Sequence, residues 1–534
     1  MTTTPCATAH TPAWDELVAA ALLGTERRTP PVQPRPGQDP AAALLDEAAL
    51  RTVQRRAALL PAAAGARPEA APDDPRPPLP PAAARRLALL LADRAGPGGA
   101  GRQGSAPDLT ELLPQWLTAA NGHGYRAPAP LLPGLLDTAR ARSDLRAEAL
   151  ALAGPRALWL ARLNPQWAYA LRGTAAGSAA LPSAAGEQFW HEGLFAERAA
   201  LLASLRRGDP AAARELLATT WAEERAEDRL MFLDTLREGV SLADEPFLEQ
   251  ALSDRSRNVR ALAAELLSAL PGSALAARMA ERARACVSLD LTGTREDRRI
   301  AVEAPPECDS AMQRDGVAAK PPSGRGERSW WLTQLVEAAP LATWYERLGV
   351  TGAAEAVALP VADGWQPDLH AAWCRAAVRQ RDAAWARALL GPATAPPAPE
   401  GGTWRDPAKL LSALPPAERA VWVADFIAAH GLSDAFRLLG VCAVPWAEPL
   451  GRAVVDALDI ARDAGSYPWS FSGVMGMAER CLDPAEAGRL EVLTSVPDEE
   501  SAPPGASGYW AEAFRRLVDT LRLRGVMRAE LGAP

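Results

Sequence analysis

The sequence predicts an all-α protein, and three observations carry this prediction. Alanine, leucine, arginine and glutamate, which are strong helix formers, make up much of the chain. Residues branched at the β-carbon, which favour strands, are scarce. Apolar residues recur at helical spacing in segments that proline and glycine separate. The chain therefore is expected to consist of successive helices joined by short breaks.

Length and charge limit the class of protein. The 534 residues are enough for about three or four domains, or for one long repeat array. The 57 basic and 65 acidic side chains leave a net charge of −8, which argues against a general nucleic-acid binder. No uncharged apolar run reaches the length of a membrane span, and residues 1–13 lack the basic and apolar segments of a secretion signal. We therefore expect a cytoplasmic protein that contacts no membrane.

Residues 13–180 are predicted to form an N-terminal helical region interrupted by linkers rich in proline, alanine and glycine, after a disordered tail at 1–12. Residues 61–82 are predicted to be one such linker, because proline and alanine dominate them. The helices are expected near 14–23, 41–60, 82–94, 109–117, 131–153 and 156–163. The second of them has an apolar face formed by Leu44, Leu45, Leu50 and Val53.

Residues 185–284 contain the clearest repeat pattern. An apolar stripe at helical spacing follows Asp254 and consists of Val259, Ala263, Leu266, Leu267 and Leu270. Asp254 is in a position to cap the helix that carries this stripe. The segment resembles the second helix of a HEAT-type repeat, and Asp209 opens a weaker match 45 residues earlier. We therefore predict HEAT-like repeats here and a HEAT-like α-solenoid of helical pairs for the whole chain.

The HEAT resemblance also implies a set of ion pairs. In such arrays an aspartate and an arginine of successive repeats often form a ladder. The residues of this chain that the resemblance places in the ladder are Asp209, Asp254, Arg214 and Arg260.

Residues 285–329 are predicted to be an insertion that contains a small β-hairpin near 286–304. The segments 286–291 and 299–304 alternate with the period of a strand, and Gly293–Asp297 is suited to the turn between them. The rest of the insertion is expected to be a loop. It carries Asp309 and Asp315, which, with Asp290, Glu303 and Glu307, form a carboxylate group suited to acid–base chemistry or Mg²⁺. We interpret these carboxylates as solvated loop charges instead.

Residues 330–534 are predicted to be a C-terminal helical region. Its helices are expected over 330–338, 340–348, 367–388, 416–430, 432–440, 446–463, 470–482, 484–490 and 509–530. Tryptophan is concentrated here, and two interpretations stay open: it fills an alanine-rich core, or it lines a groove for a partner. Trp330 and Trp331 are adjacent on one helix and cannot both face one core, so at least one is expected to be exposed.

The sequence contains no catalytic, cofactor or metal motif that we recognise. The six cysteines and five histidines are dispersed without metal-ligand spacing. Neither of the two lysines, Lys320 and Lys409, lies in a phosphate-binding loop, and no G-x-S-x-G is present. We therefore predict a protein that is not an enzyme and has no cofactor.

Three motifs together resemble one family. They are Trp14–Arg27, the central 244–260 segment, and Asp315–Gly316 followed by Gly326–Leu332. They resemble an uncharacterised bacterial family, common in actinobacteria, of HEAT-repeat-like proteins. Its members are typically encoded beside a MoxR-type AAA+ ATPase, a von Willebrand A domain protein and a SWIM zinc-finger protein. The resemblance implies an accessory role in an ATPase-linked system and supplies no catalytic residue.

Function is accordingly predicted to be that of a protein–protein interaction scaffold or adaptor, with the AAA+ ATPase and the von Willebrand A protein as expected partners. A curved surface would present arginine and tryptophan to the partner. The residues proposed for this contact are Arg257, Arg260, Arg325, Arg328, Trp330 and Trp331. The alternative is a HEAT-like nucleic-acid-binding protein or DNA glycosylase, which the net charge of −8 disfavours.

Overall fold

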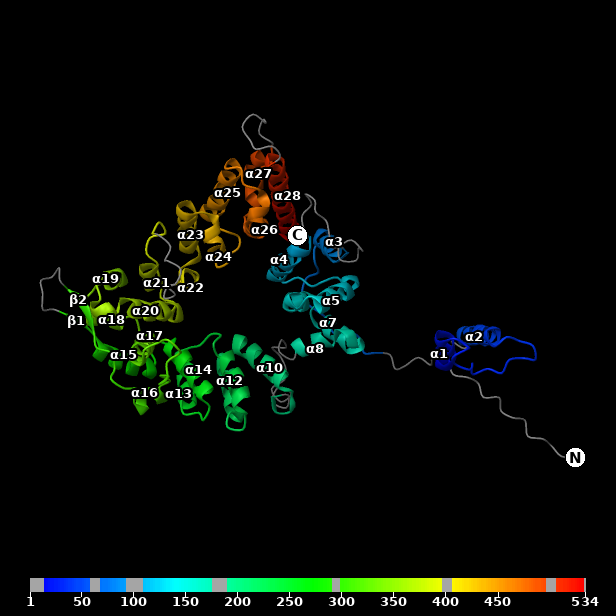
Figure 1. Ribbon diagram of the computed structural model, residues 1–534, viewed down its shortest axis with the longest axis horizontal. Helices are drawn as coiled ribbons and strands as arrows, with labels where there is room; N and C mark the ends of the chain where they lie inside the picture. Colours follow the sequence, from blue (N-terminus) through cyan, green and yellow to red (C-terminus); the bar gives the residue numbers. More distant parts are fainter. Residues whose placement is uncertain are drawn as a thin grey trace. The chain divides into compact units, whose positions relative to one another are not determined.

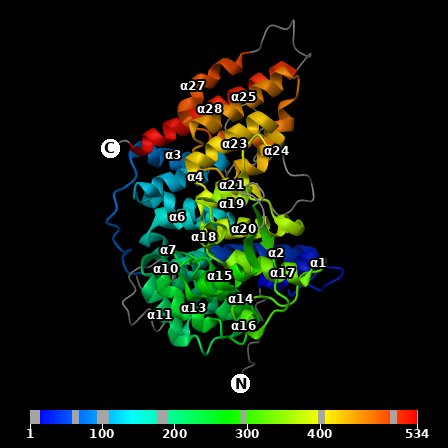
Figure 2. The same ribbon diagram turned by 90° about the vertical axis from the view of Figure 1, so that its left-hand side faces the viewer.

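The computed structural model describes residues 14–57, 68–92, 109–174, 190–290, 298–395, 406–495 and 506–532 (Figures 1 and 2). Helices dominate these residues, which also contain a two-stranded antiparallel sheet. The predicted all-α helical-repeat class with a small hairpin is therefore confirmed. The chain divides into two compact units, residues 1–71 and 72–534. The tail predicted at 1–12 lies outside the described residues.

The first unit contains α1 (Trp14–Leu23) and α2 (Pro40–Ala57). Leu17 and Ala20 of α1 are buried with Leu44 of α2. The rest of the predicted apolar face of α2 is not covered: Leu45, Leu50 and Val53 are more than half exposed, at 69%, 51% and 63%. The predicted helix is present, and its pairing with α1 buries only a narrow stripe of its apolar residues.

The second unit begins with an extended segment that was predicted to belong to a linker. Instead, the N–H of Leu79 donates to the carbonyl of Arg126 (3.2 Å), and the N–H of Arg126 donates to the carbonyl of Pro77 (2.9 Å). The guanidinium of Arg76 donates to the Asp74 carboxylate (2.7 Å) and to the carbonyl of Ala151 (2.7 Å). Proline prevents a helix here but leaves its carbonyl free to accept, so residues 72–80 pack as an ordered strap.

The strap packs on the helices that follow it. Leu79 belongs to a hydrophobic cluster formed by these helices. They are α3 (Pro81–Ala92), α4 (Leu109–Gly122), α5 (Leu132–Ala141), α6 (Arg146–Ala153), α7 (Pro155–Leu163) and α8 (Ala168–Thr174). The helix predicted over 109–117 was too short, because α4 continues to Gly122.

The predicted repeat region forms successive helices that pack on their neighbours. They are α10 (Phe195–Gly208), α11 (Pro210–Thr220), α12 (Ala226–Thr235), α13 (Glu245–Ala251), α14 (Arg257–Ser268) and α15 (Ala274–Cys286). α10 packs on α11, α13 on α14, and α12 on α14. The predicted stripe is buried throughout, from Val259 to Leu267 on α14 and at Leu270 just after the helix ends. The helical period at this position was therefore interpreted correctly.

The predicted ion-pair ladder is wrong in its partners. Asp209 caps α11 by accepting from the N–H groups of Ala211 and Ala212. Arg214 contacts Asp244 instead, at 3.1 Å. Asp244 is fully buried and also accepts from Arg206 at 2.6 Å. The carboxylate that pairs with the arginines of this repeat is therefore Asp244, which lies between α12 and α13.

Asp254 also differs from its predicted role. Its carboxylate pairs with Arg229 at 2.8 Å and accepts from the N–H of Ser256 at 2.7 Å. Ser256 is the residue at the N-cap of α14, so Asp254 holds the turn before the helix rather than the helix itself. Arg260 donates to the carbonyl oxygens of Asp254 (2.7 Å) and Arg255 (3.0 Å), not to a carboxylate.

The predicted hairpin is present. Strand β1 (Val287–Asp290) pairs antiparallel with β2 (Arg299–Val302), with Val287 opposite Val302. Val287 and Ile300 are buried, which fixes the face that packs on the helices. The turn predicted at 293–297 lies outside the described residues.

Helices follow the hairpin and lead into the tryptophan-rich core, and the first of them, at Ser310–Arg314, interrupts the segment that was expected to be a loop. They are α16 (Ser310–Arg314), α17 (Glu327–Ala338), α18 (Thr343–Leu348), α19 (Ala353–Ala358), α20 (Gln366–Gln380), α21 (Ala383–Leu390) and α22 (Pro407–Ser412). The single helix predicted over 367–388 is two helices. The chain turns at Arg381, which has a left-handed backbone (φ 53°), and Asp382 caps α21 by accepting from the N–H of Trp385.

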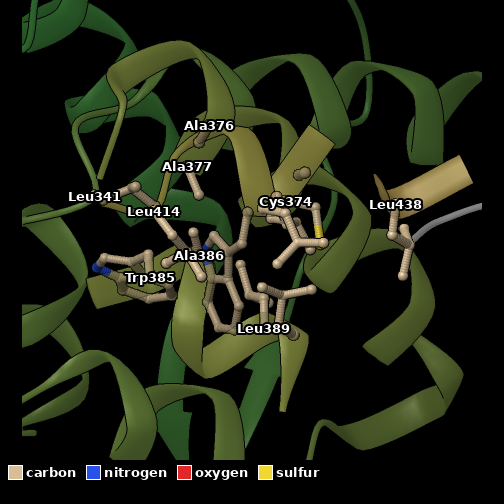
Figure 3. Packing of buried hydrophobic residues seen from close by; sticks show 14 of the residues in the cluster. Leu341, Cys374, Ala376, Ala377, Trp385, Ala386, Leu389, Leu414 and Leu438 are labelled. Carbon is tan, nitrogen blue, oxygen red and sulfur yellow. The ribbon is translucent and has the colours of Figure 1, made fainter. Parts of the chain in front are cut away.

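Tryptophan fills this core. Trp344, Trp373 and Trp385 are fully buried, with ring centroids 5.9 Å apart for Trp344–Trp373 and 5.1 Å apart for Trp373–Trp385. Figure 3 shows Trp385 packed among alanine and leucine side chains. For these residues the core interpretation is confirmed, because small side chains leave volume that an indole fills. Trp404 lies outside the described residues.

The last helices return the chain to the start of the second unit. They are α23 (Pro416–His430), α24 (Leu432–Leu439), α25 (Glu448–Asp463), α26 (Ser472–Cys481), α27 (Ala487–Leu490) and α28 (Ala506–Gly532). Trp510 and Phe514 of α28 belong to the larger hydrophobic cluster, whereas Met527 and Leu531 belong to the cluster of α3–α8. Helix α28 therefore joins the two cores of this unit (Figures 1 and 2).

Polar contacts also join the C-terminal end of α28 to the first helices of the second unit. The Arg86 guanidinium on α3 pairs with Glu530 at 2.8 Å, and the hydroxyl of Tyr125 donates to the carbonyl of Leu531 at 2.9 Å. Helix α8 also contacts α10. The helices of the second unit thus form a closed circuit of contacts.

Candidate functional site

The first two residues proposed for partner binding lie at the start of α14. Arg257 is exposed. Arg260 is partly buried and is used by its own turn, where it donates to two backbone carbonyls. Their role in partner binding stays a prediction, but only Arg257 of the two presents an exposed side chain.

The other four proposed residues lie together at the start of α17. The indole N–H groups of Trp330 and Trp331 donate to the carbonyls of Ala318 and Ala319, each at 2.8 Å. Trp331 is buried and Trp330 is partly buried. The expectation that at least one would be exposed is met only in part, by the partly exposed Trp330, because the loop that precedes α17 accepts a hydrogen bond from each indole.

The two arginines of this group also make internal contacts. Arg328 donates to the carbonyls of Pro305 and Ala304. Arg325 lies 3.7 Å from Asp368 and 5.7 Å from the centroid of the Trp330 ring. The four residues thus fasten the loop after the hairpin onto α17. Whether they also bind a partner is a prediction that these contacts do not decide.

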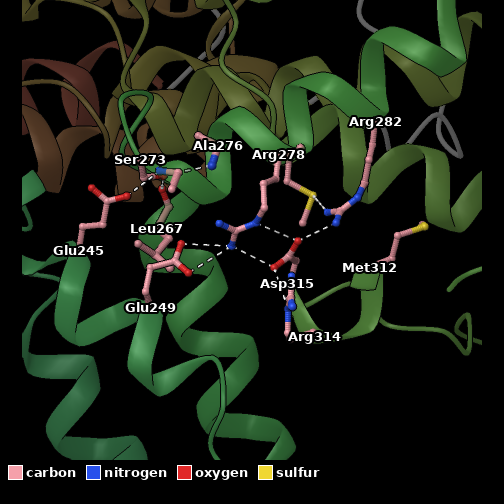
Figure 4. Close-up of polar contacts among 12 residues, drawn as sticks. Glu245, Glu249, Leu267, Ser273, Ala276, Arg278, Arg282, Met312, Arg314 and Asp315 are labelled. Atoms are coloured by element: carbon pink, nitrogen blue, oxygen red, sulfur yellow. Dashed lines mark hydrogen bonds and ion pairs between the residues drawn. The ribbon is translucent and has the colours of Figure 1, made fainter. Parts of the chain in front are cut away.

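Asp315, interpreted above as a solvated loop charge, is fully buried. Its carboxylate accepts from Arg278 at 2.9 Å and pairs with Arg282 at 2.7 Å (Figure 4). Burial raises the pKa of this carboxyl, but the hydrogen bonds and charges of the two arginines outweigh it and hold the pKa below its ordinary value. Among the described residues no cluster of carboxylates, histidines and cysteines is suited to a metal. Asp315 is therefore a structural anchor of the loop.

Gly316, next to this anchor, gives a first testable prediction. Its backbone is left-handed (φ +94°), and a Cβ atom there would lie 2.3 Å from the Cβ of Ala264 on α14. We expect Gly316→Ala to destabilise the protein by about 2–5 kcal/mol, from backbone strain and overlap together. Gly324→Ala is the matched control, with a similar φ of +85° and open space around it. Urea denaturation that gave equal losses for both variants would show that α14 does not press on Gly316.

A basic pocket of about 770 Å³ lies where the ends of α12, α14 and α20 meet α22. We call it the α14–α20 pocket. Its apolar wall includes Leu266, Val378 and Leu410. Its cationic side chains are Arg237, Arg375, Arg379, Arg381 and Lys409, and its carboxylates are Glu265 and Asp406. Cations therefore outnumber carboxylates in the lining.

Most of these cations are held in place by carboxylates. Arg237 pairs with Glu265 at 2.8 Å, and this contact raises the pKa of Arg237. Arg375 and Arg379 both pair with Glu337, which lies beside the pocket. Paired guanidinium groups retain donors that a further carboxylate can use. The ion pairs with Glu265 and Glu337 also hold these three guanidinium groups in place in the absence of a ligand.

Arg381 and Lys409 are the cations with the least compensation. Arg381 is exposed and forms no ion pair with any residue that the structure describes. Its left-handed backbone is unusual for a residue other than glycine, and such strain is concentrated at functional positions. Lys409 lies 3.7 Å from Asp406, with 72% of its side chain exposed. The excess positive charge is therefore at the mouth of the pocket.

Two cysteines outside the pocket, Cys286 and Cys442, are buried. Burial raises the pKa of the Cys286 and Cys442 thiols to about 11, so neither is a thiolate nucleophile at neutral pH. Cys374, in the wall of the pocket, is buried. The arrangement provides a surface of paired and unpaired guanidinium groups beside apolar side chains.

This pocket was missed from the sequence for a definable reason. The segment around Arg381 was predicted to continue one helix, so its side chain was not placed at a helix end. The sequence did contain a signal for a helix break at this position: Asp382 precedes Ala383, and aspartate is a typical N-cap residue. The other side of the pocket comes from 237–269, and no local pattern predicts that the two segments meet.

The fold and the pocket define an all-α helical-repeat protein with a basic pocket between its repeats. The chain belongs to DUF5691, a family of unknown function, whose family model matches residues 16–531. The expectation of an uncharacterised family is thereby confirmed. No curated protein matches the chain. Within the described residues, no helix is both long and apolar enough to cross a bilayer.

Proposed function

We propose that the protein is a non-enzymatic interaction scaffold whose α14–α20 pocket holds an acidic segment of a partner protein. The observation that carries the proposal is Arg381, an exposed cation at a strained backbone position without an ion-pair partner among the described residues. Arginine binds carboxylates through paired, geometrically fixed hydrogen bonds. An acidic side chain of a partner would supply the carboxylate that Arg381 lacks.

The composition of the pocket favours a protein segment as the ligand. Leu266, Val378 and Leu410 supply apolar surface beside the cations. A segment with both acidic and apolar residues matches this surface, and arginine beside apolar walls is typical of interface hot spots. A nucleic-acid backbone would instead need a series of unpaired cations, whereas Arg237, Arg375 and Arg379 are already paired.

The identity of the partner rests on the sequence resemblance. The family that the sequence motifs resemble is typically encoded beside a MoxR-type AAA+ ATPase and a von Willebrand A domain protein. We therefore propose one of these two as the partner and the cytoplasm as the place where they meet. The scaffold would hold the partner through the α14–α20 pocket and perform no chemistry on it.

The test is affinity capture of the tagged full-length protein from its native host, with and without ATP, followed by mass spectrometry. We expect the wild type to retain the ATPase or the von Willebrand A protein. Arg381→Glu should lower the recovery about tenfold or more, which corresponds to at least about 1.4 kcal/mol. Arg85→Glu, an equal charge change at an exposed residue of α3, is the control and should have no effect.

Three outcomes would contradict the proposal. Equal recovery by wild type and Arg381→Glu would exclude the pocket. Loss of the partner in Arg257→Glu alone would place the contact at the start of α14, as the sequence predicted. Recovery of nucleic acid in place of a protein would favour the alternative function.

A further inference from the structure

A second pocket of the same unit lies between α4 and the C-terminal part of α28. Its volume is about 440 Å³, within the range of small-molecule sites, about 300–1,000 Å³. Leu112 and Trp116 of α4 and Met527 and Leu531 of α28 supply apolar walls. The pocket thus lies at the place where α28 closes the circuit of helices.

One wall of this pocket contains a buried arginine. Arg524 is only 5% exposed. Its Nη1 donates to the carbonyls of Glu479 (3.0 Å) and Leu482 (2.7 Å), while its Nε and Nη2 have no hydrogen bond to any described residue. The Glu479 carboxylate is already held by Arg516 at 2.8 Å. Arg524 therefore has no ion pair within the described part of the chain.

Arg206, another buried arginine of the described residues, has a different environment. Arg206 is compensated by the buried Asp244 carboxylate. Arg524 has carbonyl oxygens as its hydrogen-bond partners, and the Asp483 carboxylate, which raises its pKa from beyond hydrogen-bond range, lies 3.6 Å from Arg528 instead. A buried cation without a directly paired counter-charge is costly. Burial, followed by the charge of Arg528, lowers the pKa of Arg524 to about 10, so the group is still cationic at neutral pH. An anion in the pocket would remove this penalty.

We infer that this pocket binds a small amphipathic carboxylate. The carboxylate would accept from the free Nε and Nη2 donors of Arg524, and the apolar body would lie between α4 and α28. Trp116, which is 2% exposed, contributes an indole ring to the apolar wall. The inference uses none of the residues of the α14–α20 pocket, so either proposal can fail without the other.

The experiment is calorimetric titration of the full-length protein with octanoate, compared with octanamide, which has the same shape without the charge. We expect one octanoate per chain and binding of octanamide at least about tenfold weaker. Arg524→Met should weaken octanoate binding by about 10- to 100-fold, the range for a hydrogen bond to a charged group. Because this change also removes contacts to two carbonyls, circular dichroism must show that the variant is folded.

A second variant keeps Arg524 intact. Ala119→Phe places a ring in the pocket from α4 and should abolish binding by occupying the space. Arg522→Gln, on the same helix but outside the pocket lining, should change the affinity less than about threefold, because Arg522 is exposed and pairs with Glu491 at 2.7 Å. Equal binding of octanoate and octanamide, or unchanged binding in both Arg524→Met and Ala119→Phe, would overturn the inference. Tighter binding of a peptide through its C-terminal carboxylate would also overturn it, since the ligand would then be a protein.

Discussion

Asp244→Ala is expected to destabilise the repeat region by about 3–5 kcal/mol, the cost of removing one partner from a buried ion pair. The Asp244 carboxylate is fully buried and accepts from Arg206, from Arg214 and from the N–H of Ser241. The Arg206 side chain is also fully buried, so the substitution leaves it without a counter-charge. Arg206 also donates a hydrogen bond to the carbonyl of Gly239, which lies in the wall of the α14–α20 pocket. The variant should therefore also loosen the pocket.

Hydrogen exchange measures this effect helix by helix, which suits a protein with more than one core. Amides of α10 to α13 should exchange faster by more than a hundredfold in Asp244→Ala. The control is Asp234→Ala, which removes an ion pair whose carboxylate is 62% exposed and should cost less than about 1 kcal/mol. Similar exchange in the two variants would show that Asp244 does not anchor the repeat.

The same carboxylate makes the stability depend on pH. Burial raises its pKa, but the hydrogen bonds from Arg206 and Ser241 and the charge of Arg206 lower it further, so the folded value lies below the ordinary 3.8. The stabilisation is therefore complete above pH 3.8 and is lost as the pH falls through the folded pKa. Asp244→Ala, which lacks this group, should lose less stability than the wild type over that acid range.

Leu531→Ala is also expected to destabilise the protein strongly, by about 2–5 kcal/mol, through the loss of a buried leucine and the cavity it leaves. Leu531 is 1% exposed and belongs to the hydrophobic cluster of α3–α8, far from α28 in sequence. Its backbone carbonyl also accepts from Tyr125. We expect the C-terminal turns of α28 to separate from α3 and α4 more often in the variant.

Hydrogen exchange of α3, α4 and residues 523–532 checks this prediction, with an expected acceleration of about thirtyfold or more. Val526→Ala is the matched control on the same helix, because Val526 is 49% exposed. Its change should stay within about 0.5 kcal/mol. If α3 and α4 kept their protection in Leu531→Ala, the circuit of helices would not depend on α28.

Local patterns predicted the elements whose signals lie in the chain itself. The helix predicted over 416–430 is α23 (Pro416–His430), because Pro416 suits a first turn and Gly431, with φ 84°, ends the helix. The hairpin followed from the alternation of residues around Leu289 and Ile300, which are paired in the sheet. In both cases the determining contacts join residues that are close in sequence.

The remaining features depend on contacts between distant segments. Arg214 pairs with Asp244 rather than with a residue at the repeat position that the resemblance implied. Residues 72–80 pack because Arg126 supplies the matching backbone groups. Arg381 and Arg524 are candidate binding residues only because distant segments form a pocket around each of them. No local sequence pattern distinguishes them from the many other arginines of the chain. Composition and periodicity contain no information about such pairings.

The most direct test of the account is a photo-crosslinking residue at Lys409, which lies at the mouth of the α14–α20 pocket with 72% of its side chain exposed. Irradiation in the native host should attach a protein to this position, through a segment rich in acidic residues, and Arg381→Glu should remove the adduct. The same probe at Arg85 should give none. Adducts that persist in Arg381→Glu, or a probe at Lys409 that captures nothing above the Arg85 background, would contradict the claim that this pocket holds a partner.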